Sequence, residues 1–354
     1  MTAIRTVRSE AGFTLIELMI AALVTTVIMG VAFSTFDNAL QLNESVLNQA
    51  DSSQNLRAGT NILTRDLMQA GRNLPIGGIS IPSGNAASAI HRPSPPNQAY
   101  LFDNTTATSL SSIVTGSAKG PTVDGRTTDI VTILMDDPFL SSLTVNTSTT
   151  AGAVPKLTVT GDAFSVGTNT AWLQGDSAEE IAAIKVGDLI YFLNATGSTI
   201  QTVTKVDTSN VYFEAGDPFN FNQRSATAGS ITQILGSAMT VRRVYMYSYW
   251  VAQDAGVPRL MRALNMYPAT ALAGIVEDLD LNYDLVDGVV NPVNVNDLPF
   301  TSGGNTFSAS QIRKVNVHVG VRSETKSKNS NDYLRNHVST VVSVRNLAYV
   351  DRYK

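Results

Sequence analysis

The sequence predicts an α+β fold in which one long N-terminal helix packs on an antiparallel β-sheet that carries a small all-β insertion. Three observations lead to this prediction. An uncharged apolar run, residues 18–36, is followed by apolar residues at helical spacing as far as Leu74. Short runs that alternate apolar and polar residues then recur along the chain. Gly, Ser, Thr, Asn and Val are abundant, which suits short strands joined by polar turns.

The apolar run follows a short basic leader. Arg5 and Arg8 lie in residues 1–12, whereas residues 18–36 carry no charged side chain. A helix of this length crosses a bilayer core, since it rises about 1.5 Å per residue and the core is roughly 30 Å thick. Positive residues before the span favour a cytoplasmic N-terminus, so the remaining chain is expected to be exported. An ordinary signal peptide is the alternative, but residues 37–39 make a poor cleavage site.

One carboxylate, Glu17, lies at the start of this span. A carboxylate costs about 2.5–3.5 kcal/mol at the bilayer centre and less near the interface, so such a residue usually has a function. The run Gly12-Phe13-Thr14-Leu15-Ile16-Glu17 resembles the prepilin signature of type IV pilin-like proteins. A plain signal anchor, with Glu17 at the level of the lipid headgroups, is the simpler alternative.

The resemblance implies three roles. A prepilin peptidase would cleave between Gly12 and Phe13 and methylate the new amino group of Phe13. Glu17 would neutralise the Phe13 amine of a subunit during filament assembly. A paired ammonium and carboxylate are tolerable in an apolar helix bundle, whereas either group alone is costly. Residues 13–36 would then be the transmembrane helix and, after assembly, the filament-core helix.

Residues 37–74 are predicted to continue the same helix as an amphipathic half. The leucines that define the apolar stripe are Leu40, Leu47, Leu56, Leu63, Leu67 and Leu74. The helix should end near residues 71–74, because Pro75 disfavours helix in the residue before it and Gly77 and Gly78 follow.

The remaining chain is predicted to form three parts. Residues 75–150 hold a linker rich in Gly, Ser and Pro and the first strands of the globular domain. Residues 151–222 are interpreted as the small all-β insertion, with a short helix at 177–184. Residues 223–354 complete the sheet. The strand signals lie at 130–135, 156–159, 189–193, 200–206, 211–214, 231–235, 241–250, 273–283, 315–321 and 338–347.

The C-terminal part is similar to PilW-like minor pilins and to the related J-type pseudopilins of type II secretion. The similarity lies in a Tyr-rich strand at 241–250, the Leu260-x-Arg262 turn, the strand 276–283 and the final run Val342-x-Val344-Arg345-Asn346. Asp284 departs from the Gly that often follows the strand tyrosine. The insertion at 151–222 lies outside this similarity.

No enzymatic motif is found in the sequence. The chain has no cysteine, no Gly-x-Ser-x-Gly elbow and no phosphate-binding loop. Its histidines, His91, His318 and His337, are scattered and are interpreted as surface or strand residues. A net charge of -4 gives no overall basic footprint for nucleic acid. We therefore expect a non-enzymatic protein without a cofactor.

Three residue clusters leave binding alternatives open. Acidic residues could hold calcium, although alternation places Asp278 and Asp280 on one strand face, most simply the solvated one. The aromatic strand could be a binding platform, but core packing is the simpler interpretation. The basic cluster could contact DNA, but a solvated loop is simpler. The clusters are Asp136, Asp137, Asp278, Asp280, Asp284 and Asp287; Tyr245, Tyr247, Tyr249 and Trp250; and Arg313, Lys314, Arg322, Lys326 and Lys328.

By resemblance, the chain is expected to be a minor pilin that helps to initiate type IV pilus assembly and lies at or near the tip. Its expected partners are the prepilin peptidase, other minor and major pilins, the inner-membrane assembly platform and, before assembly, membrane lipid. It would be a single-pass protein of the bacterial inner membrane that later reaches a pilus or pseudopilus at the cell surface. A type II secretion pseudopilin and a pilus-tip adhesin are the two alternatives, and the sequence names no ligand.

Overall fold

The structure of this chain is a computed structural model that divides into two units. The first consists of Met1–Asp51 and Ser323–Leu334, and the second of Ser52–Arg322 and Arg335–Lys354. The described residues are 12–95, 100–138, 143–145, 157–160, 163–167, 184–206, 210–224, 228–235, 239–326 and 331–347. The short helix expected at 177–184 lies, except for Ile184, outside the described residues.

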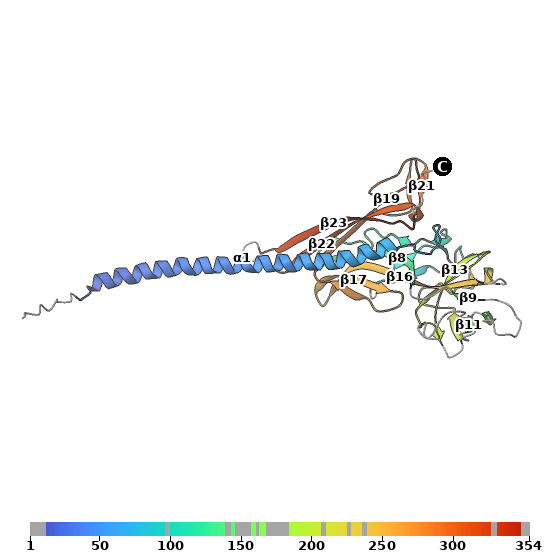
Figure 1. Cartoon of the computed structure of the whole chain (residues 1–354), viewed down its shortest axis with the longest axis horizontal. Coiled ribbons are helices and arrows are strands. Elements are labelled where there is room, and N and C mark those ends of the chain that lie inside the picture. Colours follow the sequence, from blue (N-terminus) through green and yellow to red (C-terminus); the bar gives the residue numbers. More distant parts are fainter. Residues whose placement is uncertain are drawn as a thin grey trace, which may run out of the picture. The chain divides into compact units, whose positions relative to one another are not determined.

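The dominant element is α1, Leu15–Gln69, a single helix of 55 residues that contributes to both units (Figure 1). Within the first unit, Thr25, Thr26 and Thr35 donate their hydroxyl groups to the carbonyls four residues earlier. These bonds satisfy polar side chains that have no water partner in an apolar environment. The helix continues through Gly30, where a Cβ would meet no atom within 4 Å.

The C-terminal end of α1 lies in the second unit. Gly71 takes a φ of 74° and donates its N–H to the Leu134 carbonyl over 2.9 Å. A positive φ at this position suits glycine and redirects the chain away from the helix axis. Asn73 also has a positive φ, 55°, and Pro75 follows. The helix therefore ends at Gln69, shortly before Gly71 and Pro75.

An eight-stranded antiparallel sheet forms the centre of the second unit, and its long strand is β16, Met239–Asp254 (Figure 1). β16 pairs with β9 and β12 near its start and with β8 and β17 further along. The other strands of this sheet are β5 (Ile113–Val114), β8 (Val131–Asp136), β9 (Leu143–Val145), β12 (Leu189–Asn194), β13 (Gly197–Thr202), β17 (Val257–Leu264) and β18 (Thr270–Ala273).

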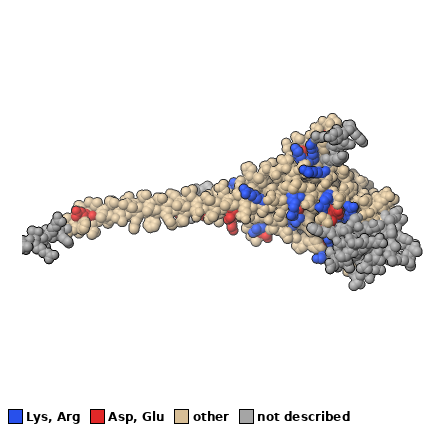
Figure 2. Space-filling view, in the orientation of Figure 1, with Lys and Arg blue, Asp and Glu red and all other residues tan. Residues whose placement is uncertain are grey.

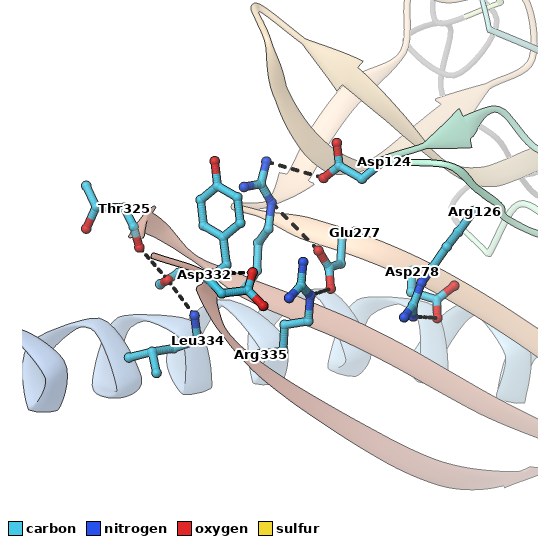
Figure 3. A network of polar contacts seen from close by, with 11 residues as sticks. Asp124, Arg126, Glu277, Asp278, Thr325, Asp332, Leu334 and Arg335 are labelled. Carbon is cyan, nitrogen blue, oxygen red and sulfur yellow. Dashed lines mark hydrogen bonds and ion pairs between the residues drawn. The ribbon is translucent and has the colours of Figure 1, made fainter. Parts of the chain in front are cut away.

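A three-stranded sheet in the order β19-β22-β23 completes the main core. Its strands are β19 (Val276–Leu285), β22 (Ile312–Lys326) and β23 (Tyr333–Ser343). The segment Ser323–Leu334, which belongs to the first unit, is closed by hydrogen bonds of its own. Leu334 donates its N–H to Ser323 Oγ over 3.0 Å, and Ser323 donates its hydroxyl to the Thr325 carbonyl (Figure 3).

The remaining elements are short. A four-stranded sheet has the order β10-β11-β15-β14, and four two-stranded pairs join β1 to β4, β2 to β3, β6 to β7 and β20 to β21. Their bounds are β1 Ile79–Ser80, β2 Ile90–Arg92, β3 Tyr100–Phe102, β4 Ser109–Leu110, β6 Thr122–Val123, β7 Arg126–Thr127, β10 Leu157–Thr160, β11 Ala163–Gly167, β14 Lys205–Val206, β15 Asn210–Glu214, β20 Phe300–Ser302 and β21 Asn305–Phe307, with 3₁₀ turns at Ile231–Gln233 and Ala309–Gln311.

The main core lies between α1 and these two sheets. Leu56, Leu63 and Leu67 of α1 are buried against apolar residues of β8, β16, β19 and β22. Each fully buried leucine contributes about 1.5–3 kcal/mol relative to an exposed one. The α+β prediction, with a long N-terminal helix on an antiparallel sheet, is thus confirmed.

The strands of residues 151–222 belong to two different sheets. β10, β11, β14 and β15 form the four-stranded sheet, whereas β12 and β13 join the central sheet through the pairing of β12 with β16. Alternation predicts that a segment is a strand but does not identify its partner. The sequence alone therefore did not show that β12 and β13 belong to the central sheet and the other four strands to a separate one. Removing residues 151–222 would also remove these two strands of the central sheet.

Candidate functional site

The candidate site lies where α1 begins. Thr14 precedes the first helical residue, and its hydroxyl oxygen accepts the N–H of Glu17 over 3.3 Å. The Glu17 carboxylate returns the contact, because its Oε2 accepts both the N–H and the hydroxyl of Thr14 at 2.9 Å. A Thr and a Glu three residues apart form the capping box, which satisfies N–H groups that the first helical turn leaves free.

The capping box places a negative charge at the positive end of the helix. A carboxylate there is favourable by roughly 0.3–1 kcal/mol through the helix dipole. Both members, Thr14 and Glu17, lie on the C-terminal side of the bond between Gly12 and Phe13. Cleavage at that bond would therefore leave the box intact and create an amine one residue before it. The Thr-x-x-Glu spacing is the sequence signal of this motif, and it lies within the run that resembles the prepilin signature.

The surface after the capping box is apolar on all sides. Phe13 is 90% exposed, and every residue from 14 to 36 is exposed as well. Figure 2 shows this part of the molecule as an almost unbroken tan surface. Among the described residues, α1 is the one helix long and apolar enough to cross a membrane. A helix that is apolar all round requires lipid or neighbouring helices around it.

The aromatic strand predicted at 241–250 is divided between two faces. Tyr247 and Tyr249 belong to the core that includes α1, whereas Trp250 belongs to a separate cluster with Ile130 and Ala263. Tyr249 donates its hydroxyl to Asp66 of α1. Burial raises the pKa of Tyr249, so its hydroxyl stays protonated and able to donate.

A buried ion pair fixes α1 on the sheet. Arg262 donates from Nη2 to Asp66 Oδ2 at 2.5 Å, and its guanidinium lies 3.8 Å from the ring centre of Tyr247. Asp66 is 3% exposed. Sequence reasoning treated Arg262 as part of a turn and did not single out Asp66, because the two residues are 196 positions apart. No local pattern links residues so distant in the chain.

The acidic residues that suggested calcium are distributed among separate contacts. Asp278 lies 3.8 Å from Arg126 (Figure 3), and Asp284 accepts the N–H of Asn294 and the amide of Asn316. Asp287 caps its own turn by accepting the N–H groups of residues 289–291. Within the described part of the chain, no group of three His, Cys, Asp or Glu residues is arranged to hold a metal ion.

Asp136 and Asp137 also have their own partners. Asn73 donates to Asp136 Oδ2 over 3.0 Å, and Arg243 pairs with Asp137 at 2.6 Å. Burial raises the pKa of Asp136, with the amide of Asn73 and the charge of Arg242 acting in the opposite direction. These two carboxylates thus belong to structural contacts of the central sheet.

The basic cluster is only partly free. Arg322 lies 3.5 Å from Asp124 and 3.7 Å from Glu277, and Glu277 also pairs with Arg335 at 2.7 Å (Figure 3). Arg313 and Lys314 are exposed. Lys326 lies over the ring of Tyr333, and Lys328 is outside the described residues.

The three histidines lie on three different strands. His91 is in β2, His318 is in β22 and His337 is in β23. The ring of His318 forms a hydrogen bond of 2.7 Å with Ser339 Oγ through Nδ1. This contact joins β22 to the neighbouring strand β23.

Comparison with known proteins supports the interpretation of the N-terminus. Residues 7–33 match the family model of the prokaryotic N-terminal methylation motif. No curated protein and no solved structure matches the chain. The match supports a type IV pilin-like or pseudopilin protein that is processed by prepilin peptidase and assembles with other pilins. It also fits an N-terminal helix that anchors the protein in a membrane.

Proposed function

We propose that this protein is a minor pilin of a type IV pilus, and that it belongs to the PilW-like branch. The observation that carries the proposal is the methylation motif at residues 7–33, which coincides with the start of an exposed apolar helix. Residues 75–354 add a globular part of 280 residues. Such a bulky part suits a subunit present in few copies better than one that tiles densely along a filament.

The N-terminal segment performs two tasks in succession. The peptidase first removes residues 1–12 and methylates Phe13 on the cytoplasmic side. Residues 13–36 then remain in the inner membrane until the assembly platform extracts them into the apolar core of a filament. This transfer exchanges lipid for neighbouring helices, so the apolar surface stays out of water in both states.

Glu17 sets the position of the incoming subunit by pairing with its neighbour's N-terminal amine. In the isolated chain its carboxylate is held by neutral donors of Thr14. In the filament the carboxylate also accepts a hydrogen bond from the Phe13 ammonium of a neighbouring subunit. Hydrogen bonds between charged partners are roughly twice as strong as those between neutral ones, and the surroundings are of low dielectric constant. The pair therefore fixes the register between two subunits.

We place the protein at or near the tip of the pilus, together with other minor pilins that initiate assembly. The C-terminal similarity at 241–250, 276–283 and 342–346 supports this placement. No step of catalysis is assigned to the protein, and its class is structural.

Mass spectrometry of the N-terminal peptide tests the proposal. Native cells are divided into membranes and mechanically sheared surface filaments, and the peptide is identified in each fraction. A methylated Phe13 terminus in the sheared filaments is the expected result. A processed form found only in membranes would instead favour a pseudopilin of type II secretion. An intact Met1, or a cleavage after residue 36, would overturn the pilin interpretation.

A further inference from the structure

The bond between Gly12 and Phe13 lies just outside α1. The helix begins at Leu15, and residues 12–14 precede it. Gly12 and Phe13 are exposed, and a Cβ built on Gly12 would meet no atom within 4 Å beyond its chain neighbours. Within the described part of the chain, nothing therefore covers the bond that the prepilin peptidase is proposed to cleave.

The first hydrogen bond of the helical ladder shows how close α1 comes to this bond. The N–H of Leu18 donates to the carbonyl of Thr14 over 3.2 Å. In a helix that began two residues earlier, the N–H of Ile16 would donate to the carbonyl of Gly12. That carbonyl is the group that a peptidase attacks. The helix therefore stops two residues short of enclosing the scissile bond.

The capping box holds the helix start at this place. Thr14 Oγ1 accepts the N–H of Glu17 over 3.3 Å, and Glu17 Oε2 accepts the N–H of Thr14 over 2.9 Å. In a helix longer by one residue, the Glu17 N–H would donate to the carbonyl of Phe13 instead. The Thr14 hydroxyl thus competes with Phe13 for one donor. A bond to the hydroxyl keeps the helix from growing towards the leader.

A helix that starts too early would hinder the chemistry of cleavage. Hydrolysis breaks the bond between the Gly12 carbonyl carbon and the Phe13 nitrogen, and water supplies the hydroxyl of the new carboxyl group and a proton of the new amine. Donors of the enzyme must reach the carbonyl oxygen as charge develops on it. A carbonyl bonded inside a helix must first lose that hydrogen bond, which is costly beside a membrane.

A helix that starts too late would misplace the bond. Under the proposed function the apolar run lies in the membrane, so the helix start determines how far the scissile bond lies from the bilayer. Each residue adds about 1.5 Å when it is helical and up to about 3.3–3.6 Å when it is extended. Loss of the first helical turn would therefore move the bond by several ångströms. A misplacement of about 1 Å already slows a well-positioned reaction.

We propose that Thr14 is a positioning residue for the cleavage: its hydroxyl fixes the start of α1 and thereby holds the scissile bond outside the helix and at a set distance from the membrane. The inference rests on the proposed function, since it presupposes cleavage between Gly12 and Phe13. The hydroxyl acts on the backbone N–H of residue 17 and not on its carboxylate. This role therefore precedes assembly and is separate from the pairing proposed for Glu17.

Three substitutions of Thr14 test this role, in membranes that contain the full-length precursor and a prepilin peptidase. Thr14→Val keeps the shape of the side chain but removes the hydroxyl, whereas Thr14→Asn changes the shape but restores a capping oxygen. Thr14→Ser retains the hydroxyl. We expect the initial rate of cleavage to fall about fivefold in Thr14→Val and to stay within about twofold of the parent in the other two variants.

Thr25→Val is the matched control. The Thr25 hydroxyl donates to the Ala21 carbonyl, in the same helix but beyond its first turn. Its removal should leave the cleavage rate unchanged. Resistance of each precursor to alkaline extraction confirms that the variants are inserted in the membrane, and the mass of the N-terminal peptide gives the position of the cut.

The outcomes separate this inference from the proposed function. A parent chain that is not cut between Gly12 and Phe13 would overturn both. If the parent is cut there, a parental rate in Thr14→Val, or an equal loss in Thr25→Val, would overturn only the role of Thr14. An equal loss in Thr14→Asn would overturn it as well, because the peptidase would then recognise the shape of the side chain and not the helix start.

Discussion

The two halves of α1 distribute their apolar residues differently, and the difference identifies the environment that each half requires. Residues 18–36 carry no charged side chain and are exposed on every side. From Leu56 to Ala70 only one stripe is buried, at spacings of three and four residues. An apolar helix without a polar face needs lipid or other helices, whereas a striped helix needs one sheet. A single continuous helix thus suits two environments: lipid or other helices around its first half and one sheet beside its second half.

The carboxylates of the two halves show the same contrast. Glu17 is exposed, and its partner Thr14 is three residues away. Asp66 is buried, and its partners Tyr249 and Arg262 come from distant strands. The first carboxylate is therefore available to a neighbouring molecule, while the second is already committed within the chain.

Replacing the exposed carboxylate should have the largest effect on assembly. We expect Glu17→Ala to leave cleavage at Gly12 intact and to reduce incorporation into sheared filaments to near background, because the Phe13 ammonium of the neighbour loses its partner. Glu44→Ala, an exposed carboxylate on the same helix, is the control and should assemble normally. Immunoblots of sheared and membrane fractions measure both variants. Incorporation of Glu17→Ala at parental levels would remove the assembly role from this residue.

Replacing the buried carboxylate should instead affect stability. Asp66→Ala leaves Arg262 without its anion, and breaking a buried pair costs about 3–5 kcal/mol of the free energy of unfolding. Asp51→Ala, on the exposed surface of the same helix, should change it by less than about 0.5 kcal/mol. Guanidinium titration of the full chain in micelles, followed by tryptophan fluorescence, measures both. Equal stability of the two variants would show that Asp66 does not hold α1 on the sheet.

Substituting one leucine in each half of α1 compares their apolar surfaces. Leu63 is fully buried and Leu23 is 66% exposed. We expect Leu63→Ala to lower the free energy of unfolding by about 2–5 kcal/mol, because it leaves a cavity in the core. Leu23→Ala should leave the same titration unchanged. A comparable loss in Leu23→Ala would mean that residues 15–36 also pack on the globular part in the isolated chain.

The sequence was sufficient to predict features that depend on local patterns. The continuous helix and most of the strands follow from periodicity. The strand predicted at 231–235 was wrong, because a 3₁₀ helix, Ile231–Gln233, lies there. Glu17 stood out because it interrupts an apolar run. Pairings between distant residues were not predictable. The contact of Asp66 with Arg262 and the pairing of β12 with β16 depend on how the chain folds back on itself. The two contacts of Asn265 to Met246 were not predictable for the same reason, since they appear only once β16 and β17 are paired.

Two glycines of α1 differ in the space around them. A Cβ on Gly59 would lie 2.8 Å from the Cβ of Ala273 and 3.2 Å from Leu260, whereas Gly30 has nothing within 4 Å. We expect Gly59→Ala to lower the free energy of unfolding by about 1–3 kcal/mol through overpacking. In Gly30→Ala, alanine should raise helix stability by up to about 1 kcal/mol. Guanidinium titration reports the first and helical circular dichroism on heating reports the second. A stabilising Gly59→Ala would show that α1 can move away from β17 and β18.

The smallest effect concerns the capping box at the start of α1. Thr14→Ala removes the hydroxyl that contacts Glu17 and should cost about 1 kcal/mol of stability in the first helical turn. Thr14→Ser retains the hydroxyl and is the matched control. Because the carboxylate keeps its charge and the N–H donor of residue 14, incorporation into filaments should fall only a few-fold in Thr14→Ala and return to normal in Thr14→Ser. Hydrogen exchange at residues 15–18 measures the local opening, and the sheared fraction measures incorporation. If Thr14→Ala were as defective as Glu17→Ala, the orientation that the hydroxyl gives to the carboxylate would matter as much for assembly as its charge.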